Sequence, residues 1–479
     1  MQPLILALDQ GTTSSRALLI DSQLNVQAIA QKPLEQIYPK SGWVEHDPEI
    51  IWKSQILAAH SVVDLSGSSW DQIQGIAIAN QRETTLIWDK KTGMPLYNAI
   101  VWQDRRTKDF CQGLDAALIK AKTGLVPDPY FSASKLRWLL DTVQPSCEVA
   151  FGTVDSFLLY RLTGIHATDP TNASRTMLYN IHTHKWDDQL LELFSIPRKI
   201  LPEVMPSSGI FGYTHPGLFP KALPVAGIAG DQQAALLGQD CTKPGQIKCT
   251  YGTGCFLLEH TGSKPTVSQN HLITTVTAGK KPQYAVEGSA FIGGAAIQWL
   301  HEGLQLVKNP SEVDSLASSV TESAGVYFVP AFTGLGAPHW EPNARGTIVG
   351  LTRQTTAAHI ARATLEGVAF QVADLIDAME RDTGRPIHEL KVDGGCTKSD
   401  LLLQIQADIL GIPLLRPKTQ ELTALGVALL AGQALGIWKE RPPWELDKTF
   451  MPAISTARRE ELIEGWLNAV RCAKEWAKP

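Results

Sequence analysis

The sequence predicts an α/β protein made of two related halves. Short apolar runs that suit strands alternate with helical patterns along the chain, which is typical of α/β folds. Strands are expected at 4–8 and 17–20, joined by a turn rich in Gly, Thr and Ser. A similar unit spans 247–258, with Gly252-Thr253-Gly254 as its turn. A repeat this short can also arise by coincidence. If the two units are related, they predict two domains with a boundary near residue 240.

Length and composition describe an ordinary globular protein. The chain has 479 residues, which at about 150 per domain suggests two or three domains. Apolar residues make up 44% and charged residues 19%, which argues against a disordered or collagen-like chain. There are 43 Lys and Arg against 48 Asp and Glu, a net charge of −5, so no basic excess suggests a nucleic-acid partner.

The sequence also predicts a cytoplasmic protein without membrane insertion. The N-terminal MQPLILALDQ has no basic residue before its short apolar run, unlike a secretory signal. The apolar region 424–438 is interrupted by Gln433 and three glycines and falls short of the about 20 residues of a membrane span, so a buried helix is expected. Seven cysteines without a CxxC pair suggest free thiols. Among them, Cys241, Cys249 and Cys255 lack the close pairing of a structural zinc site.

The first turn has the composition of a phosphate-binding site. Asp9 ends the first expected strand, and Gly11-Thr12-Thr13-Ser14-Ser15-Arg16 follows it. Glycine lets the backbone approach phosphate oxygens, hydroxyl and amide groups donate to them, and Arg16 adds charge-assisted donors. Asp9 is expected to hold Mg²⁺ directly or through water. The alternative is a hydroxyl-rich surface turn.

The second turn, at 252–254, matches the first with fewer charges. We expect the two turns to face each other across a cleft and to hold the phosphates of a nucleotide from both sides. The sequence contains no GxxxxGK[ST] motif, which excludes a P-loop. Gly252 and Gly254 are not followed by a third glycine at the dinucleotide-binding spacing, so a nicotinamide site is poorly supported.

Two helices are expected in the second half, with a glycine-rich corner between them. Apolar residues from 365 to 379 recur at helical spacing, Thr355 or Thr356 can cap the start, and Gly384 lies just past the end. A strand at 390–392 leads into Asp393-Gly394-Gly395, and Ser399 can cap a helix that ends at Gly411. This corner suits an anion, although Gly-Gly is also common in ordinary turns.

A separate set of residues suits a polyol. Arg82 and Glu83 follow an expected strand at 76–79 and are expected to pair, while offering a donor and an acceptor to hydroxyl groups. Trp102 and Tyr130 have faces that suit the carbon edge of a polyol, although each alone is more often a packing residue.

Asp231 follows an expected strand at 224–228, where open α/β folds place reactive groups. It is expected to accept a hydroxyl proton as the oxygen attacks a γ-phosphate. The alternative is a helix cap.

Together these motifs resemble the FGGY family of carbohydrate kinases over about residues 4–440. The segments that carry the resemblance are LDQGTTSSRA (8–17), GWVEHDPEIIW (42–52), NQRETT (80–85), NAIVWQ (98–103), DPYFS (128–132), TNASRTMLYNIHT (171–183), AGDQQAALLGQ (229–239), TYGTGCF (250–256), VYFVPAFTGLGAP (326–338) and VDGG (392–395). Residues 346–366 also fit the C-terminal signature of the family. NQRETT and NAIVWQ are typical of glycerol-type members, whereas xylulose and gluconate members differ there.

The resemblance implies an α/β fold of two actin-like (ribonuclease H-like) domains with an ATP and substrate cleft between them. Residues 1–239 would hold the polyol site and the first phosphate hairpin, and residues 240–479 the second hairpin and the adenosine site. The implied reaction is ATP-dependent phosphorylation of glycerol to sn-glycerol 3-phosphate. Mg-ATP would lie between the two Gly-Thr hairpins. The resemblance also implies a homodimer or homotetramer.

The family's functional residues carry over to matching positions. Asp231 matches the catalytic base, and Asp9 matches the acidic residue near Mg²⁺. The implied glycerol contacts are Arg82, Glu83, Trp102, Tyr130, Asp231, Gln232 and Phe256. The implied nucleotide contacts are Thr12, Thr13, Ser14, Arg16, Thr253, Gly294, Gln298, Gly395 and Ser399.

Two departures from the family pattern matter. Ser399 stands where well-known bacterial members have an Asn against the nucleotide; Ser can still hydrogen-bond, so ATP use should survive. The segment 213–223 is shorter than in enterobacterial members and lacks the Gly-Arg segment of their fructose 1,6-bisphosphate site. We therefore expect weak or absent inhibition by that sugar.

Three other functions compete with this one. A kinase for another small polyol or triose, such as erythritol or dihydroxyacetone, would share every phosphate-binding feature, and only the surroundings of Arg82, Trp102 and Phe256 speak against it. A non-catalytic actin-like nucleotide switch would keep both turns but has no need for Asp231 beside Arg82 and Glu83. A nicotinamide dehydrogenase lacks its glycine fingerprint.

Overall fold

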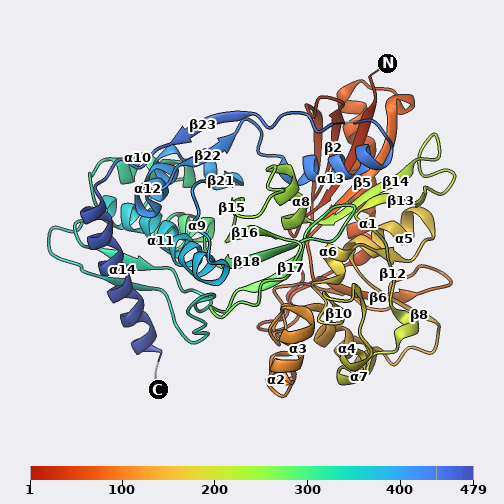
Figure 1. Ribbon diagram of the computed structural model, residues 1–479, viewed down its shortest axis with the longest axis horizontal. Helices are drawn as coiled ribbons and strands as arrows, with labels where there is room; N and C mark the ends of the chain where they lie inside the picture. The colour runs from red at the N-terminus through yellow and green to blue at the C-terminus, as the bar shows by residue number, and fades with distance from the viewer. Residues whose placement is uncertain (1, 439, 478–479) are drawn as a thin grey trace.

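The computed structural model describes residues 2–438 and 440–477 and has two large mixed sheets, one at the centre of each half (Figure 1). The first sheet has the order β13 (Ser208–Tyr213), β14 (Pro224–Gly230), β5 (Ile73–Asn80), β1 (Leu4–Gln10), β2 (Ser14–Asp21) and β3 (Val26–Pro33). The second has the order β17 (Ile273–Val276), β18 (Tyr284–Ala290), β16 (Cys255–Gly262), β15 (Ile247–Tyr251), β21 (Leu390–Asp393), β22 (Leu414–Pro417) and β23 (Leu446–Phe450).

The two sheets share one strand arrangement. In the first, β3, β2 and β1 are antiparallel neighbours, and β5 and β14 continue parallel to β1. In the second, β18, β16 and β15 are antiparallel neighbours, and β21 and β22 continue parallel to β15. The expected strand–turn–strand units are β1–β2 and β15–β16. The structure thus extends the short sequence repeat to five strands in each half.

Helices cover both sheets. In the first half these are α1 (Pro48–Ser66), α5 (Val154–Thr163) and α8 (Asp231–Gly238). In the second half they are α9 (Gly294–Glu302), α11 (Ala357–Thr383), α12 (Asp400–Leu410) and α14 (Thr456–Trp476). The expected caps are confirmed: Thr356 and Gly384 bound α11, and Ser399 and Gly411 bound α12.

Smaller elements complete the two halves. A four-stranded sheet has the order β4 (Glu45–His46), β7 (Ala99–Ile100), β6 (Thr85–Asp89) and β8 (Val149–Thr153). The short strands are β9 (Ala167–Thr168), β10 (Tyr179–Asn180), β11 (Lys185–Trp186), β12 (Glu203–Val204), β19 (Tyr327–Val329) and β20 (Thr347–Val349). The short helices are α2 (Lys108–Gln112), α3 (Ala116–Thr123), α4 (Ser132–Val143), α6 (Pro170–Ala173), α7 (Asp188–Leu193) and α10 (Val313–Ser318).

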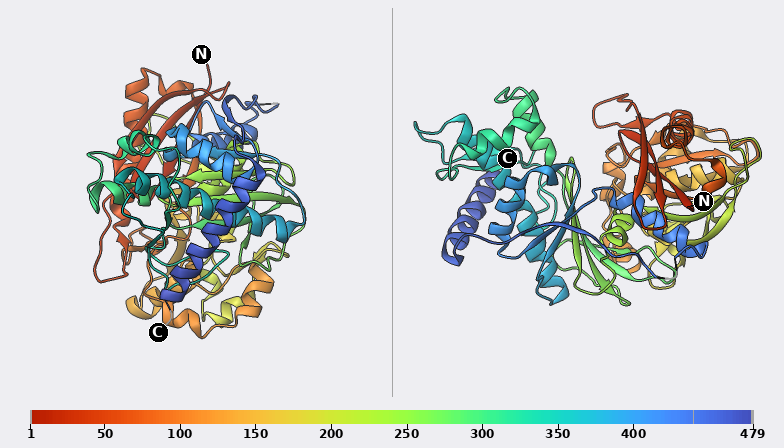
Figure 2. Two further views of the ribbon diagram at one scale, coloured as in Figure 1. Left: turned by 90° about the vertical axis from the view of Figure 1, so that its left-hand side faces the viewer. Right: turned by 90° about the horizontal axis from the view of Figure 1, so that it is seen from above.

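One helix from the end of the sequence packs on the first sheet. Helix α13 (Leu422–Ala434) contacts β14, β5 and β1, and forms an apolar cluster with Ile5, Ala7 and Ala77. It is the buried helix expected in this region. Figure 1 shows it in blue among the red strands of the first half, and in Figure 2 the blue segment that follows crosses back toward β23.

Helices α8 and α13 approach each other closely because glycines lie at their contact. A Cβ atom on Gly426 would lie 1.9 Å from the carbonyl oxygen of Ala234, and one on Gly238 would lie 2.0 Å from that of Leu422. Neither backbone contact leaves room for a side chain. The position of α8 therefore depends on α13.

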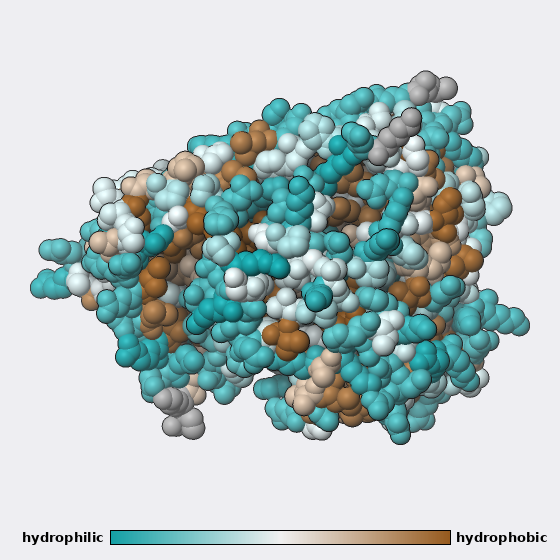
Figure 3. All heavy atoms as spheres, in the orientation of Figure 1, coloured by the Kyte–Doolittle hydropathy of each residue, from teal (hydrophilic) through white to brown (hydrophobic). Residues whose placement is uncertain are grey.

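One face of the molecule is mostly polar (Figure 3), and the cysteines are unpaired. Figure 3 shows a mostly hydrophilic face, with hydrophobic residues in separate groups and an indentation between the halves at its lower edge. None of the helices in the described part of the chain has the length and apolar content needed to cross a bilayer. All seven cysteines are free thiols, as expected.

Glu259 on β16 should make stability depend on pH. Its side chain is fully buried, and neither carboxylate oxygen accepts a hydrogen bond from a described residue. Burial raises its pKa from the usual 4.5 to about 7. The folded state therefore holds the proton more tightly than the unfolded chain, and the contribution of Glu259 to stability falls as the pH rises from about 4.5 through 7.

We expect Glu259→Gln to remove this loss. With about 1.4 kcal/mol for each tenfold change in proton affinity, the variant should exceed wild type by about 3 kcal/mol at pH 8. The difference should shrink toward pH 4. Urea unfolding at several pH values measures it, and parallel pH curves for the two proteins would contradict the assignment.

Candidate active site

Three parallel strands of the first sheet end at the same edge. Asp9 of β1 pairs in register with Ala79 of β5, and Ala79 also pairs with Ala229 of β14. Arg82 follows β5, and Asp231 follows β14 directly. Because carboxyl ends of parallel strands carry reactive groups in open α/β sheets, this edge is the candidate active site.

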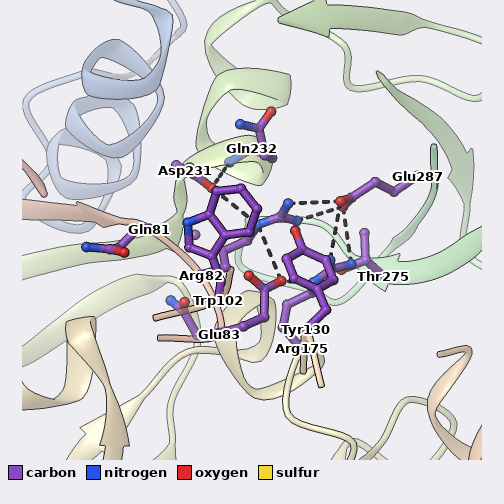
Figure 4. A network of polar contacts seen from close by, with 12 residues as sticks. Gln81, Arg82, Glu83, Trp102, Tyr130, Arg175, Asp231, Gln232, Thr275 and Glu287 are labelled. Atoms are coloured by element: carbon purple, nitrogen blue, oxygen red, sulfur yellow. Dashed lines mark hydrogen bonds and ion pairs between the residues drawn. The ribbon is translucent and has the colours of Figure 1, made fainter. Parts of the chain in front are cut away.

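Arg82 lies at the centre of a buried network (Figure 4). Its Nη1 and Nη2 donate to Glu287 Oε2 and Oε1 at 2.6 and 2.9 Å. Its Nε lies 3.2 Å from Asp231 Oδ1. The expected pairing with Glu83 is only a long contact of 3.9 Å. Glu83 has a closer partner in Arg175, whose Nε donates to Oε1 at 2.5 Å.

An aromatic group lies beside these charges. The rings of Trp102 and Tyr130 meet edge to face at 5.7 Å, and those of Trp102 and Phe256 at 6.5 Å. Trp102 Nε1 also donates to Thr12 Oγ1 at 3.0 Å, so the first turn adjoins this group. Phe256 belongs to β16, so the two halves contribute together. The structure thus brings the sequence-predicted polyol residues into one place.

Asp231 is the first residue of α8, and Gly230, not Asp231, occupies the cap position. Its Oδ1 accepts the backbone N–H of Gln232 at 2.7 Å, while Oδ2 accepts no hydrogen bond from the residues described. About a third of the side chain is exposed (32%). Burial of the rest raises its pKa, and Arg82 opposes the rise. A partly exposed carboxylate with a free oxygen is suited to act as a general base.

Asp9 and Arg16 face each other across the first hairpin. Arg16 Nη1 lies 3.5 Å from Asp9 Oδ2, and Nη2 pairs with Glu421, the residue before α13. Arg16 therefore has two carboxylate partners, which the sequence did not predict. Burial raises the pKa of Asp9 to about 6, Arg16 lowers it, and Asp231 raises it further.

This donor set fits Mg²⁺. A cation near Asp9 would relieve its repulsion with Asp231, and Mg²⁺ is commonly held by one or two carboxylates together with water and substrate phosphates. Within the described ranges, no group of three or more His, Cys, Asp or Glu side chains could hold a metal ion by itself. The phosphates of the substrate would therefore complete the coordination.

The second turn, the start of α9 and the double-glycine corner meet at one point. Gly293 N donates to Thr253 O at 2.7 Å, and Gly294 N donates to Gly252 O at 2.8 Å. A Cβ on Gly294 would lie 2.7 Å from Cys396 Sγ, and the space around Gly395 is open. Gln298, one turn along α9, is exposed and donates to Glu302.

The Ser399 hydroxyl is engaged within the protein. Ser399 Oγ accepts Leu402 N at 2.9 Å and donates to Asp314 Oδ1 at 2.8 Å, so its hydroxyl has internal partners.

The residues of the two turns differ in exposure. Thr13 and Thr253 are exposed at the tips of their turns, whereas Ser14 is buried. No hydrogen bond or ion pair joins the two turns among the residues described, so their facing arrangement stays a prediction.

Sequence reasoning missed four residues of this site. Arg175 and Glu287 hold the charged side chains, Gln233 Oε1 accepts from Arg82 at 3.3 Å, and buried Lys248 donates to Gln232 and, at 2.8 Å, to Thr250. Burial lowers the pKa of Lys248. The available signal was a lone charge within an apolar strand, as at Glu287 in AVEGSA and Lys248 in QIKCT.

Comparison with solved structures defines the class of the protein. A glycerol kinase from Plasmodium falciparum, solved with ADP, superposes with a TM-score of 0.90 at 36% identity and covers 98% of each chain. A xylulose kinase from Lactobacillus acidophilus shares the fold, with a TM-score of 0.89 at 24% identity over 98% of each chain. The fold is that of a two-domain carbohydrate kinase of the actin-like ATPase class, as expected.

The chain belongs to the FGGY family of carbohydrate kinases. Residues 4–238 match the N-terminal domain of the family and residues 247–435 its C-terminal domain. Proteins from Paraburkholderia phytofirmans and Burkholderia cenocepacia, both named glycerol kinase, are 55% identical over 492 aligned residues. Each alignment covers 99% of this chain and 98% of the relative.

Proposed function

We propose that this protein is a glycerol kinase, which transfers the γ-phosphoryl group of ATP to glycerol and gives sn-glycerol 3-phosphate and ADP. Full-length identity of 55% with proteins of that name carries the proposal. The site supports it, because a partly exposed carboxylate lies beside a buried arginine and an aromatic group.

The polyol site residues have separate roles in this proposal. Arg82 and Glu83 offer a donor and an acceptor to glycerol hydroxyl groups, and Trp102 and Phe256 cover its carbon edge. We also propose that Tyr130 and Gln232 contact the substrate. Asp231 takes the hydroxyl proton while the oxygen attacks the γ-phosphorus and the bond to the ADP oxygen breaks. Positioning and charge neutralisation supply most of the catalysis in such a transfer.

The nucleotide site is proposed from both hairpins. Hydroxyl and amide groups of Thr12, Thr13, Ser14 and Thr253 would donate to phosphate oxygens, while Gly294 and Gly395 let the nucleotide approach the backbone. Mg²⁺ near Asp9 would neutralise phosphate charge. Arg16 can donate to phosphates only through N–H groups that Asp9 and Glu421 leave free. Ser399 would have to release Asp314 to reach a nucleotide with its hydroxyl proton.

The remaining proposals concern organisation and location. We place the domain boundary between residues 239 and 240 and expect a homodimer or homotetramer. A cytoplasmic location accords with seven free thiols. Gel filtration with light scattering would measure the oligomeric state.

A polyol panel tests the substrate. ADP release should be stimulated by glycerol with a kcat/KM at least about 10-fold above that for dihydroxyacetone, erythritol or xylulose, since the buried polar groups are left unpaired by a poorly fitting substrate. An equal or greater response to another polyol would favour that kinase instead. Nucleotide binding without stimulation by any polyol would favour the nucleotide switch.

A further inference from the structure

We propose that Glu287 and Arg175 are positioning residues of the glycerol site, Glu287 orienting Arg82 and Arg175 orienting Glu83. The inference rests on the proposed function and extends it to residues that need not touch substrate. Glu287 belongs to β18 in the second half, whereas Arg82, Glu83 and Arg175 belong to the first (Figure 4).

Glu287 leaves Arg82 one N–H group to offer. The two terminal nitrogens of a guanidinium carry four N–H groups. Glu287 accepts two of them and Gln233 accepts a third, which leaves one, on Nη2, while the fifth N–H group, on Nε, faces Asp231 Oδ1 at 3.2 Å. A bidentate carboxylate fixes the plane of a guanidinium. Glu287 therefore sets the direction in which the last N–H points toward a hydroxyl group.

Arg175 orients Glu83 in a similar way. Its Nε binds Glu83 Oε1, whereas Oε2 accepts no hydrogen bond from the residues that the structure covers. The backbone of Glu83 is left-handed, with φ of 62°, and its carbonyl accepts Thr85 Oγ1 at 2.8 Å. Main chain and side chain are thus both held, and Oε2 is the atom left for a substrate hydroxyl.

Arg175 also joins the two carboxylates and the aromatic group. Its Nη1 and Nη2 lie 3.3 Å from Glu287 Oε2 and Oε1, and its guanidinium carbon lies 5.4 Å from the centre of the Tyr130 ring. The side chain is fully buried. Because water does not reach Arg175, its charge interacts only with the neighbouring side chains.

The network also ties the glycerol site to the second half. Beside the Glu287 contacts, Gln233 Nε2 donates to Thr275 Oγ1 of β17 at 2.8 Å. The two arginines hold the pKa of Glu287 near 2, so it stays ionised. Glu287 also raises the pKa of Asp231. Removing the charge of Glu287 would therefore free Arg82 and make Asp231 more acidic.

Glu287→Gln tests the proposal, with Glu259→Gln as the matched control. Glu259 is a buried carboxylate on the neighbouring strand, in register with Val286, and the groups that act on its pKa, Thr383, Arg385 and Glu380, are not among the proposed substrate residues. We expect Glu287→Gln to raise the KM for glycerol about 30- to 100-fold and the KM for ATP less than threefold. The acidic limb of the kcat/KM profile should move to lower pH. Glu259→Gln should change neither value.

Arg175→Lys provides the second arm and also guards against a folding defect in the first. Lysine keeps the positive charge but lacks the planar, forked donors of the guanidinium, so the KM for glycerol should again rise while the KM for ATP stays nearly unchanged. Glu287→Asp, which keeps the carboxylate, should raise the KM for glycerol less than Glu287→Gln does. An unchanged glycerol KM in both variants, or equal rises in the KM of glycerol and ATP, would overturn the proposal. Failure of wild type to respond to glycerol would refute the proposed function instead.

Discussion

Asp231→Asn should lower kcat for glycerol phosphorylation about 10³-fold, because loss of a positioned general base typically removes a factor of 10²–10⁴. Asparagine has the same shape, and its Oδ1 can still accept the backbone N–H of Gln232, so α8 should begin at the same residue. ADP affinity should change less than twofold. ADP release at saturating glycerol measures the first value and isothermal titration of ADP the second.

Asp188→Asn is the control for this experiment. Asp188 is the first residue of α7 as Asp231 is of α8, but its carboxylate pairs with the exposed Arg198. The control should keep wild-type kcat, since an exposed ion pair contributes little. Full activity in Asp231→Asn would refute the catalytic assignment. A small residual rate would agree with transfer driven by positioning and charge neutralisation alone.

Gly426→Ala should destabilise the protein by about 3 kcal/mol and also reduce activity. The new methyl group would lie 1.9 Å from the carbonyl oxygen of Ala234, so α13 and α8 must separate, at a cost typical of overpacked cores. Because α8 begins at Asp231, the displacement should reach the active site. Urea unfolding measures the stability, and ADP release measures the activity.

The sign of the stability change makes this test decisive. In an unconstrained helix, Gly→Ala stabilises by up to about 1 kcal/mol, so an increase in stability would contradict the close contact. Gly113→Ala is the control: its backbone has φ of −89°, and the nearest atom to the new methyl group is 3.8 Å away. Its effect should stay within about 0.5 kcal/mol.

Local patterns predicted much of this structure, because they encode local geometry. The β1–β2 and β15–β16 units, the capping of α11 by Thr356 and the ending of α12 at Gly411 all follow from spacing and from capping chemistry. Asp9, Arg82 and Asp231 were each expected at or just after the end of a strand, but only the family resemblance implied that Arg82 and Asp231 share one site.

Partners distant in sequence could not be predicted in that way. Glu287 lies 205 residues from Arg82, and no periodicity links the two. The same holds for Arg16 with Glu421 and for Ser399 with Asp314. Such pairs depend on how the halves assemble, and a lone charge within an apolar strand shows only that some partner must exist.

Helix α13 also delays the folding of the first half while the chain is being synthesised on the ribosome. Strands β1, β5 and β14 are synthesised long before residues 422–434. Arg16 can pair with Glu421 only after 405 more residues have been added to the chain. Until then, the apolar sheet face with Ile5, Ala7 and Ala77 stays uncovered in the nascent chain. Exposed apolar faces favour aggregation and chaperone binding. A polypeptide ended at residue 239 would lack α13, so we expect it to expose that apolar face and to aggregate.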